Sequence, residues 1–491
     1  MFIKKKNTIK ISINSLLIAF IIYYLLKDVD LLGFFADDGT TLYILLKDIS
    51  LNELITHSIN WDAARDLHLI WQKFFITISF SNKISNLHYY QIFFYLINAL
   101  IFCYILRKLE FNNDIILIIF ISSIFFPSYS EVAFWIHAFT MILISTFFFL
   151  IFVLLQINTL NINNIKKELI FNFFSVILLL LTWFTYEQSI FVSLLVVIII
   201  NSIKLKKKNI PKKFFLFQIF IYSLLVIFFS LYKLYDAGFF DSSITKYQTG
   251  SNIIFDYQVF KNILTSFAIN LREFFVFNKF LLTNLDVIEL IIFNILFIFF
   301  IYFILTDKKK LKFNYKFNYN VIIIFLALFI ASIFPLYFHY ISDRHNYLPS
   351  FFMFAGISYL IKFFISKNRH LFLNIIFIFL TFYFINNFVI KFNFKKYQII
   401  ENFNIKLAFY KALDNNVQIV NFKEKIFLKD FPELRNGEVF FAHEPSVNFK
   451  LIMNNETLPY ISIEDNYVIG DTIIQFNEIN KGIIDYEIYK Y

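Results

Sequence analysis

The sequence is poor in cysteine, glycine and charge. Of its 491 residues one is a cysteine, 8 are glycines and 16% are charged. The single cysteine, Cys103, excludes an intrachain disulfide and a cysteine-based metal site. So few glycines leave no glycine-rich loop to cradle a phosphate, which argues against a nucleotide-driven pump. An ordinary soluble domain is about 25% charged, so this composition does not fit a soluble protein.

Apolar side chains take the place of the missing charge. They make up 59% of the chain, and the mean hydropathy is +0.65. A protein with several membrane spans exposes such surface to lipid, whereas a soluble protein cannot hide it. The net charge of +10 does not indicate nucleic-acid binding, because the basic residues stand in short clusters between apolar runs.

Eleven apolar runs approach the length of about 20 residues that a membrane-spanning helix needs. They lie near 10–27, 89–106, 113–127, 133–157, 168–185, 188–203, 214–234, 283–305, 320–341, 350–366 and 371–392. This pattern predicts an all-α polytopic membrane protein.

The basic clusters predict the orientation of these spans. Cytoplasmic loops carry an excess of Lys and Arg. The clusters fall on one side of the membrane if the N-terminus is cytoplasmic: they are Lys4–Lys6, Arg107 and Lys108, Lys166 and Lys167, Lys204 to Lys213, Lys308 to Lys312, and Lys367 with Arg369. Only Lys391, Lys395 and Lys396, at the end of the last span, fall on the external side.

Five segments are then expected outside, and they hold most of the polar residues of interest. They are the loop 28–88, the bends 127–131 and 185–188, the loop 235–284 and the bend 342–349. The C-terminal segment would also lie outside.

The last ninety or so residues differ in composition from the rest. Residues 401–491 carry 9 basic and 14 acidic side chains. A helix is expected over 397–413, followed by short strand-like runs at 417–421, 439–441 and 461–463. We therefore predict a multi-spanning domain over 1–392 and a small external α+β accessory domain over 393–491.

Four stretches resemble, in order, the multi-spanning glycosyltransferases that use polyprenyl-phosphate sugars, known as the GT-C fold. The likeness is to the protein O-mannosyltransferase branch and the membrane part of its tetratricopeptide-bearing relatives. The stretches are FADD at 35–38, ARD at 64–66 followed by LHYYQ at 87–91 and Asn98, PSYSEVAFWI at 127–136, and DRHNYLPS at 343–350. TYEQS at 185–189 adds a weaker match.

The resemblance assigns roles to the adjacent acids Asp37 and Asp38. Sugar transfer needs a base to take the proton of the acceptor, and partial burial near a membrane raises the pKa of an aspartate toward the working range. We expect Asp38 to be the base, with Asp37 as the second candidate. The pair could instead hold a divalent metal ion, or Asp38 could cap the helical stretch that follows it.

The phosphate that leaves needs a cation, and Arg344 is the main candidate. A guanidinium binds phosphate through two hydrogen bonds and stays charged when partly desolvated. Its alternatives are an ion pair with Asp343 or a place at the lipid interface. Arg65 either binds phosphate or pairs with nearby aspartates in its loop. Lys233 is a weaker phosphate candidate, for which an interfacial position is the alternative.

Two acids and one tyrosine are candidate supporting residues. Glu131 and Glu187 lie at bends between apolar runs, where an unpaired carboxylate is expensive. They either bind sugar hydroxyls or order the acidic loop, or they cap helices at short turns. Tyr347 belongs to the fourth family-like stretch.

We therefore expect a membrane glycosyltransferase that moves a sugar from a polyprenyl phosphate to a glycan, lipid or protein acceptor at the external face. The membrane would be a bacterial inner membrane, with the site on its periplasmic side. The alternatives are a transporter of lipid-linked saccharides and a non-catalytic envelope assembly protein. A transporter would favour charged or broken helices at mid-membrane.

Overall fold

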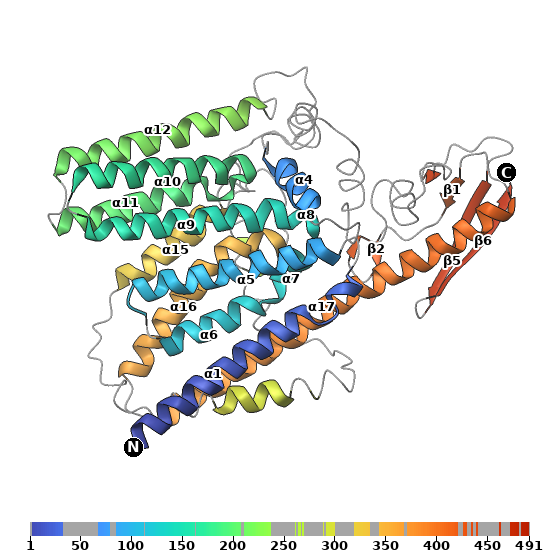
Figure 1. The fold of residues 1–491 in the computed structure, drawn as a ribbon, viewed down its shortest axis with the longest axis horizontal. Helices are drawn as coiled ribbons and strands as arrows, with labels where there is room; N and C mark the ends of the chain where they lie inside the picture. Colours follow the sequence, from blue (N-terminus) through green and yellow to red (C-terminus); the bar gives the residue numbers. More distant parts are fainter. Residues whose placement is uncertain are drawn as a thin grey trace.

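The computed structural model is a bundle of long helices, from which one helix extends toward a small group of strands (Figure 1). The structure describes residues 2–32, 67–78, 85–111, 113–162, 164–207, 211–236, 261, 264–266, 268–269, 288, 291–299, 319–333, 343–367, 371–420, 426–429, 434–435, 438–439, 461–462, 472–480 and 483–490. All structural statements below concern these residues.

Long helices account for most of the described chain. They are α1 (Phe2–Leu26), α4 (His68–Ile78), α5 (Ser85–Lys108), α6 (Asn113–Ile124), α9 (Ile144–Asn158), α10 (Ile165–Thr185), α11 (Ile190–Lys206), α12 (Lys212–Asp236), α15 (Tyr319–Ile333), α16 (Tyr347–Lys367) and α17 (Leu371–Val420). Short turns connect them: η1 (Val29–Leu31), η2 (Pro127–Tyr129), α7 (Ser130–Phe134), α8 (Ile136–Ala138), the π-helical η3 (Phe139–Leu143), η4 (Thr159–Asn161), η5 (Glu187–Ser189) and η7 (Asp343–Asn346).

Local sequence explains several helix ends. The side chain of Asn164 accepts hydrogen bonds from the backbone N–H groups of Lys166 (2.9 Å) and Lys167 (3.4 Å), so it caps the first turn of α10. Arg107 and Lys108 occupy the last turn of α5, where positive charge is favourable to the helix dipole.

Aromatic side chains fill the core around the turn η2. The ring of Phe126 contacts those of Tyr129, Phe354 and Phe388 at centroid distances of 5.1, 5.2 and 5.3 Å. These residues come from η2 and its preceding residue, from α16 and from α17, and all four are buried. Edge-to-face ring packing of this kind fixes the positions of the elements that carry it.

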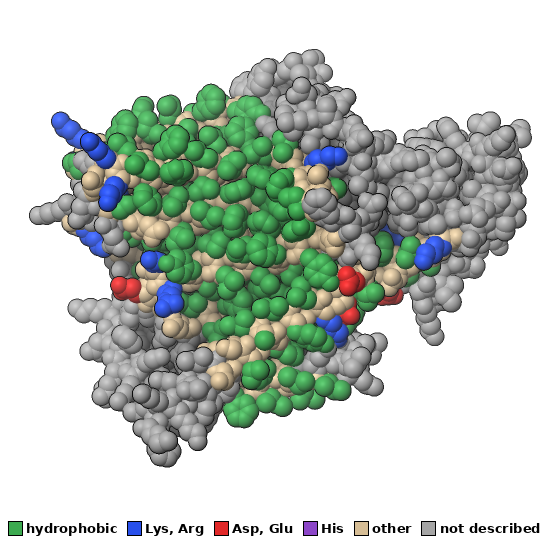
Figure 2. All heavy atoms as spheres, in the orientation of Figure 1, with side chains coloured by type: hydrophobic (Ala, Val, Ile, Leu, Met, Phe, Trp, Pro, Cys, Tyr) green, Lys and Arg blue, Asp and Glu red, His purple; other side chains and the backbone are tan. Residues whose placement is uncertain are grey.

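Five described helices are long and apolar enough to cross a membrane. They span Asn86–Lys108, Phe139–Asn158, Lys166–Thr185, Glu187–Lys206 and Lys212–Lys233, and each coincides with an expected span. Large apolar side chains such as Phe173, Phe220 and Phe228 are more than half exposed. Apolar atoms cover the visible face of the bundle, with charges at its edges (Figure 2). Length and composition therefore support an α-helical integral membrane protein.

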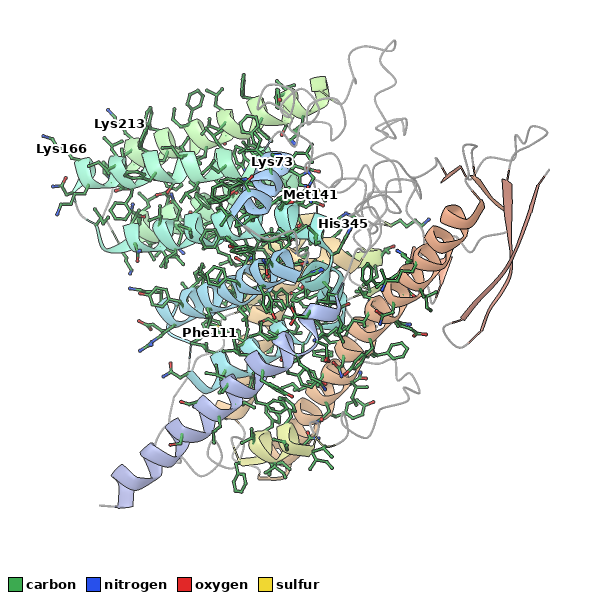
Figure 3. The ribbon with its side chains drawn as sticks, turned by 45° about the vertical axis from the view of Figure 1, so that its right-hand side comes forward. Lys73, Phe111, Met141, Lys166, Lys213 and His345 are labelled. Atoms are coloured by element: carbon green, nitrogen blue, oxygen red, sulfur yellow. The ribbon has the colours of Figure 1, made fainter. Side chains whose placement is uncertain are left out.

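The two ends of the bundle differ in character. Lys166 and Lys213 lie at one end, which we call the basic end, whereas Lys73, Met141 and His345 lie at the other (Figure 3). The first two belong to the clusters expected on a single side of the membrane. The opposite end, which we call the site end, carries the bends 127–131, 185–188 and 343–346.

The structure places Lys204 differently from what the basic clusters predict. It was expected in a solvent-facing loop, but it lies inside α11, fully buried, and pairs with Glu168 of α10. The charge-pattern rule concerns loop residues, and it cannot tell a loop lysine from one in the last turn of a helix whose side chain faces a partner acid.

The basic cluster at the end of the last expected span, which falls on the external side, also has a structural explanation. Lys391 and Lys396 are buried side chains within α17. The ammonium group of Lys396 donates to the backbone carbonyl of Lys27, just after α1, and lies 5.8 Å from the ring centroid of Phe134. These lysines are packed and partnered inside the protein, so they carry no information about loop orientation.

Helix α17 runs without a break for 50 residues. The boundary expected at residue 393 falls inside it, and so does the separate helix expected over 397–413. The strand expected at 417–421 was wrong, because residues 417–420 are the last turn of α17. The helix that precedes this run outweighs the strand preference of Val417, Ile419 and Val420.

Six strands follow α17 in the part of the chain that the structure describes. They are β1 (Ile426–Lys429), β2 (Leu434–Arg435), β3 (Glu438–Val439), β4 (Ile461–Ser462), β5 (Thr472–Asn480) and β6 (Ile483–Lys490). One sheet has the order β4-β1-β5-β6, in which β1 is parallel to both neighbours, and β5 and β6 form an antiparallel hairpin. Strands β2 and β3 form a separate antiparallel pair. The sheet lies beside the C-terminal half of α17 (Figure 1).

The opposed ends predict a labelling pattern. Thr77 on α4 and Lys213 on α12 are both exposed, and their helices reach the site end and the basic end respectively (Figure 3). A membrane-impermeant maleimide applied to intact cells should label Thr77→Cys and leave Lys213→Cys unlabelled until the membrane is opened. The native Cys103 is buried and should not compete. Labelling of both positions from the same side would contradict this arrangement of the bundle.

Candidate functional site

Tyr129 joins two of the family-like stretches at the site end. It ends the turn η2, and its hydroxyl donates to the backbone carbonyl of Tyr347 (3.1 Å) at the start of α16. The same hydroxyl is hydrogen-bonded to the hydroxyl of Ser350. Burial raises the pKa of Tyr129 well above its ordinary value, so the phenol stays protonated and can donate.

The rings around this contact form one aromatic cluster. Tyr129 lies 4.7 Å from Tyr347 and 6.3 Å from Tyr95 of α5, measured between ring centroids. Tyr95 and Tyr347 are 5.9 Å apart, and the hydroxyl of Tyr95 donates to the carbonyl of Ile124 (2.7 Å). Tyr347, expected as a supporting residue, is thus a fully buried packing residue that holds two stretches together.

The third bend joins the same group. Gln188, in the turn η5, donates from its side-chain amide to the backbone carbonyl of His345 in η7. Gln188 and His345 are both buried. Residues 157 positions apart therefore share a hydrogen bond, and η7 is attached to η5 as well as to η2.

Side chains of the second family-like stretch form hydrogen bonds with the backbone that follows the bend 127–131. Gln91 of α5 donates to the backbone carbonyls of Val132 and Trp135, both at 2.8 Å. A ring nitrogen of His88 lies 3.0 Å from the side-chain oxygen of Gln91. Asn98 donates to the carbonyl of Leu143 (2.9 Å). The polar side chains of this stretch thus satisfy carbonyls that the breaks in the following helix leave open.

Two of the expected site residues form an ion pair. The Lys233 ammonium lies 3.8 Å from a carboxylate oxygen of Glu187, and each side chain is 15% exposed. Lys233 also lies 5.4 Å from the ring centroid of Phe229. The lysine expected to contact phosphate and the glutamate expected to bind sugar or order a loop are therefore neighbours at the site end, joining η5 to α12.

The remaining expected residues fall partly or wholly outside the described structure. Asp37, Asp38 and Arg65 lie outside the described residues. The backbone places Glu131 in α7 and Arg344 in η7, while their side chains lie outside the description. Both bends that carry them belong to the group joined by Tyr129.

Both ends of the segment that carries the acid pair are anchored at the site end. Before it, η1 packs on α5, and Asp30 lies 3.4 Å from the hydroxyl of Tyr89. After it, the backbone N–H of Leu67 donates to the carbonyl of Phe184 (3.1 Å), near the end of α10. The described residues on either side of 33–66 therefore lie beside the bends described above.

Metal binding finds no support in the described part of the chain, where no three His, Cys, Asp or Glu side chains come together as a metal site. The only acids proposed for a metal, Asp37 and Asp38, lie outside it. Among the described residues at the site end, the cations Lys73 and Lys233 could contact an anion.

The chain matches no protein-family model, no curated protein and no solved structure. We therefore infer a function from the residues themselves, from how the bends come together, and from the resemblance of the family-like stretches.

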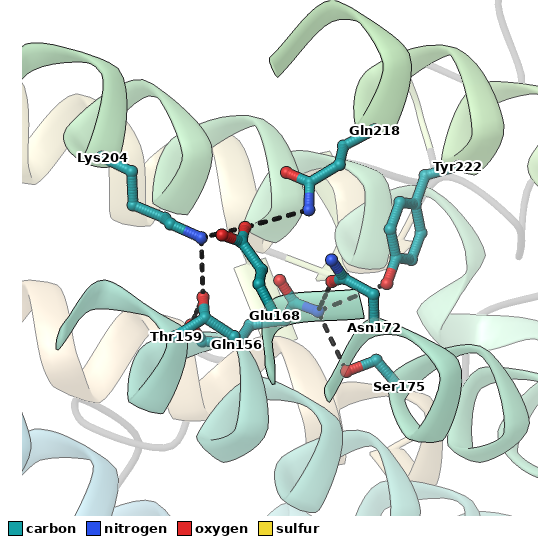
Figure 4. A network of polar contacts seen from close by, with 8 residues as sticks. All are labelled: Gln156, Thr159, Glu168, Asn172, Ser175, Lys204, Gln218 and Tyr222. Atoms are coloured by element: carbon teal, nitrogen blue, oxygen red, sulfur yellow. Dashed lines mark hydrogen bonds and ion pairs between the residues drawn. The ribbon is translucent and has the colours of Figure 1, made fainter. Parts of the chain in front are cut away.

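A second polar cluster lies away from the site, among α9 to α12 (Figure 4). The Glu168 carboxylate contacts the Lys204 ammonium and accepts a hydrogen bond from Gln218 (3.0 Å). Lys204 also donates to the hydroxyl of Thr159 (3.4 Å). Glu168 is in the first turn of α10 and Lys204 in the last turn of α11, so the pair belongs to the basic end.

Sequence reasoning did not find this cluster. Its neighbouring part joins Gln156 to Ser175 (3.0 Å), to Tyr222 (3.3 Å) and to Asn172 (3.4 Å). The sequence feature that could have indicated it is Glu168, an acid that directly follows lysines at the start of an apolar run. Because Gln218 and Tyr222 come from α12, the contacts attach this helix to α9 and α10.

The Tyr129 contact predicts a stability effect. Tyr129→Phe removes a buried hydroxyl and with it one of the hydrogen bonds to the Tyr347 carbonyl, so the free energy of unfolding should fall by about 0.5–1.5 kcal/mol. Tyr104→Phe on the exposed side of α5 is the matched control and should change it by less than about 0.5 kcal/mol. Denaturant unfolding of the purified protein in detergent measures both, and equal effects of the two substitutions would contradict the role of Tyr129.

The buried ion pair predicts a larger effect. Lys204→Met leaves the Glu168 carboxylate buried without its cation, which should cost about 3–5 kcal/mol of unfolding free energy. The double variant Glu168→Gln with Lys204→Met should be more stable than Lys204→Met alone, because no charge remains to be compensated. Lys207→Met, at an exposed position after α11, is the control. A double variant as unstable as the single one would contradict this explanation.

Proposed function

We propose that the protein is a GT-C-like membrane glycosyltransferase that moves a sugar from a polyprenyl phosphate to a glycan, lipid or protein acceptor. The observation that carries the proposal is the meeting of separate stretches at one end of the bundle. Bends that lie more than 200 residues apart in sequence are joined there by Tyr129, and the segment with the acid pair starts and ends beside them. A site assembled from distant segments fits a reaction that needs a base and a phosphate-binding group together.

In this proposal the acids act on the acceptor. Asp38 takes the proton of the attacking hydroxyl, and Asp37 is the alternative base. The new bond forms between the acceptor oxygen and the anomeric carbon, while the bond from that carbon to the phosphate oxygen breaks. Removing the proton makes the acceptor oxygen a better nucleophile at the moment of attack. A divalent metal held by the two acids is the alternative role for the pair.

Arg344 holds the phosphate as it leaves. Its backbone sits in η7, and neighbouring residues of that turn are held by Gln188 from one side and by Ser350 and Tyr129 from the other. A group at a fixed position stabilises developing charge without reorganising at the moment of reaction. Arg65 and Lys233 are the further phosphate-binding candidates, and the Glu187 partner of Lys233 sets the position of its ammonium.

The orientation in the membrane is part of the proposal. With about eleven spans and a cytoplasmic N-terminus, the basic end faces the cytoplasm and the site end faces outward. In a bacterial inner membrane the reaction would then occur on the periplasmic side. The segment from about residue 393, which includes the second half of α17 and the strands, would be an external α+β accessory domain that contacts the acceptor.

The main rival is a transporter of lipid-linked saccharides. Such a protein would gain support from a charged pair at mid-membrane. The buried pair Glu168–Lys204 lies instead at helix ends, in the first turn of α10 and the last turn of α11. Its place fits the joining of helices at the basic end. A non-catalytic assembly protein would leave the acid pair and Arg344 without a role.

Substitutions at the proposed base and phosphate-binding group should have different effects. Asp38→Asn keeps the shape of the side chain and removes proton acceptance, so turnover should fall by roughly two to four orders of magnitude with donor binding nearly unchanged. Arg344→Ala should reduce both donor affinity and turnover, and Arg344→Lys should restore only part, because an ammonium lacks the two-pronged geometry. The assay is transfer of labelled sugar from a polyprenyl phosphate in reconstituted membranes.

The controls decide which part of the proposal survives. Thr77→Val, on an exposed face of α4, should transfer sugar at the normal rate. Normal turnover in Asp38→Asn would move the role of the base to Asp37. Normal turnover in Asp38→Asn, in Arg344→Ala and in their double variant would exclude sugar transfer at this site.

A further inference from the structure

Helix α4 presents a polar face to the interior of the site end. Among its residues His68, Leu69, Gln72 and Phe75 are buried, whereas Phe74 and Thr77 are exposed. Residues three and four positions apart lie on the same side of a helix. His68, Gln72 and Phe75 therefore form one inward-facing row.

The position of this row is fixed by contacts of residues on either side of Gln72. The indole N–H of Trp71 donates to the hydroxyl of Thr185 (3.1 Å) at the end of α10. The ring of Phe75 lies 5.0 Å from that of Phe139 in η3 and 5.6 Å from that of Phe94 in α5. Gln72, between these contacts, is held against the bundle.

Gln72 differs from the other buried glutamines near it. It is 1% exposed, and within the described part of the chain neither its amide nitrogen nor its amide oxygen has a hydrogen-bond partner. By contrast, Gln91 and Gln188 both donate to backbone carbonyls. Leaving a buried amide without a partner is costly, and native proteins do so rarely. A binding site for a polar ligand explains such a group.

The element opposite α4 is also unusual. Residues Phe139–Leu143 form a turn of π-helix, η3, and all five are buried. Turns of this kind are often found at functional sites, because the extra residue opens the regular hydrogen-bond ladder. Helix α4 packs directly on η3. The helix that carries the unsatisfied amide therefore packs on a π-helical turn.

We propose that Gln72 binds a hydroxyl group of the sugar carried by the lipid donor. The inference rests on the proposed function and adds a residue that reads the sugar. A carboxamide both donates and accepts, which suits hydroxyls, whereas a phosphate would call for a cation. Gln72 thus distinguishes a sugar-bearing lipid from a bare one.

The test compares lipids with and without a sugar. Binding of polyprenyl phosphates carrying glucose, mannose or no sugar is measured on the purified full-length protein and on Gln72→Met, a substitution close in volume. The wild-type protein should bind at least one sugar-bearing lipid more tightly than the bare lipid. Gln72→Met should bind that sugar-bearing lipid about 3- to 10-fold more weakly, as expected for one lost hydrogen bond, and should bind the bare lipid unchanged.

Thermal stability provides the second measurement. Because the amide has no hydrogen-bond partner among the described residues, Gln72→Met should raise the apparent melting temperature by roughly 1–3 °C. Gln91→Met is the matched control: it removes hydrogen bonds to the Val132 and Trp135 carbonyls, so it should lower the melting temperature and weaken both lipids alike.

Each outcome decides between the two proposals. If Gln72→Met keeps the full preference for the sugar-bearing lipid, or loses stability as Gln91→Met does, Gln72 is a structural residue and this inference is wrong while the proposed function stands. If the wild-type protein shows no preference for either sugar-bearing lipid over the bare one, the proposed function fails, and the role of Gln72 fails with it.

Discussion

Buried backbone carbonyls near the described bends accept hydrogen bonds from side chains of other segments, and the arrangement of the site end depends on these contacts. A buried carbonyl without a donor is costly, so such bends need side-chain donors. Tyr129, Gln188 and Gln91 supply them at the site end, to Tyr347, to His345, and to Val132 and Trp135. Each donor belongs to a different segment from its acceptor, so satisfying the bends also assembles them. The positions of the bends at the site end follow from these hydrogen bonds.

Buried charge follows the same logic at the opposite end. Glu168 and Lys204 neutralise each other where α10 begins and α11 ends, and Gln218 adds a donor from α12. Lys396 shows a third solution, in which a buried cation caps the carbonyl of Lys27 at the end of another helix. In both cases a buried charged group pairs with a counter-charge or a backbone carbonyl of another segment. These described charges thus join helices, as the Glu187–Lys233 pair does at the site end.

Sequence patterns predicted the helices well and their partners poorly. Apolar runs long enough for a bilayer are a local property, so five of the expected spans coincide with observed helices. By contrast, the burial of Lys204 beside Glu168 depends on a residue 36 positions away in sequence, and the lack of a hydrogen-bond partner for Gln72 among the described residues depends on how α4 packs. Composition cannot report a contact between residues 157 or more positions apart, such as the one from Gln188 to His345.

The way the site end is built suits a reaction between a lipid phosphate and a hydroxyl. Turn η7 is fixed by hydrogen bonds from two directions, so a cation carried on it occupies a set position where charge develops. The acid pair sits in a segment whose two ends are anchored at η1 and at Leu67, and the Glu187–Lys233 pair closes the side toward α12. In the proposed reaction the base, the phosphate-binding group and the sugar-binding amide come from three separate segments. Of these, η7 and α4 are held by hydrogen bonds to other elements of the described structure.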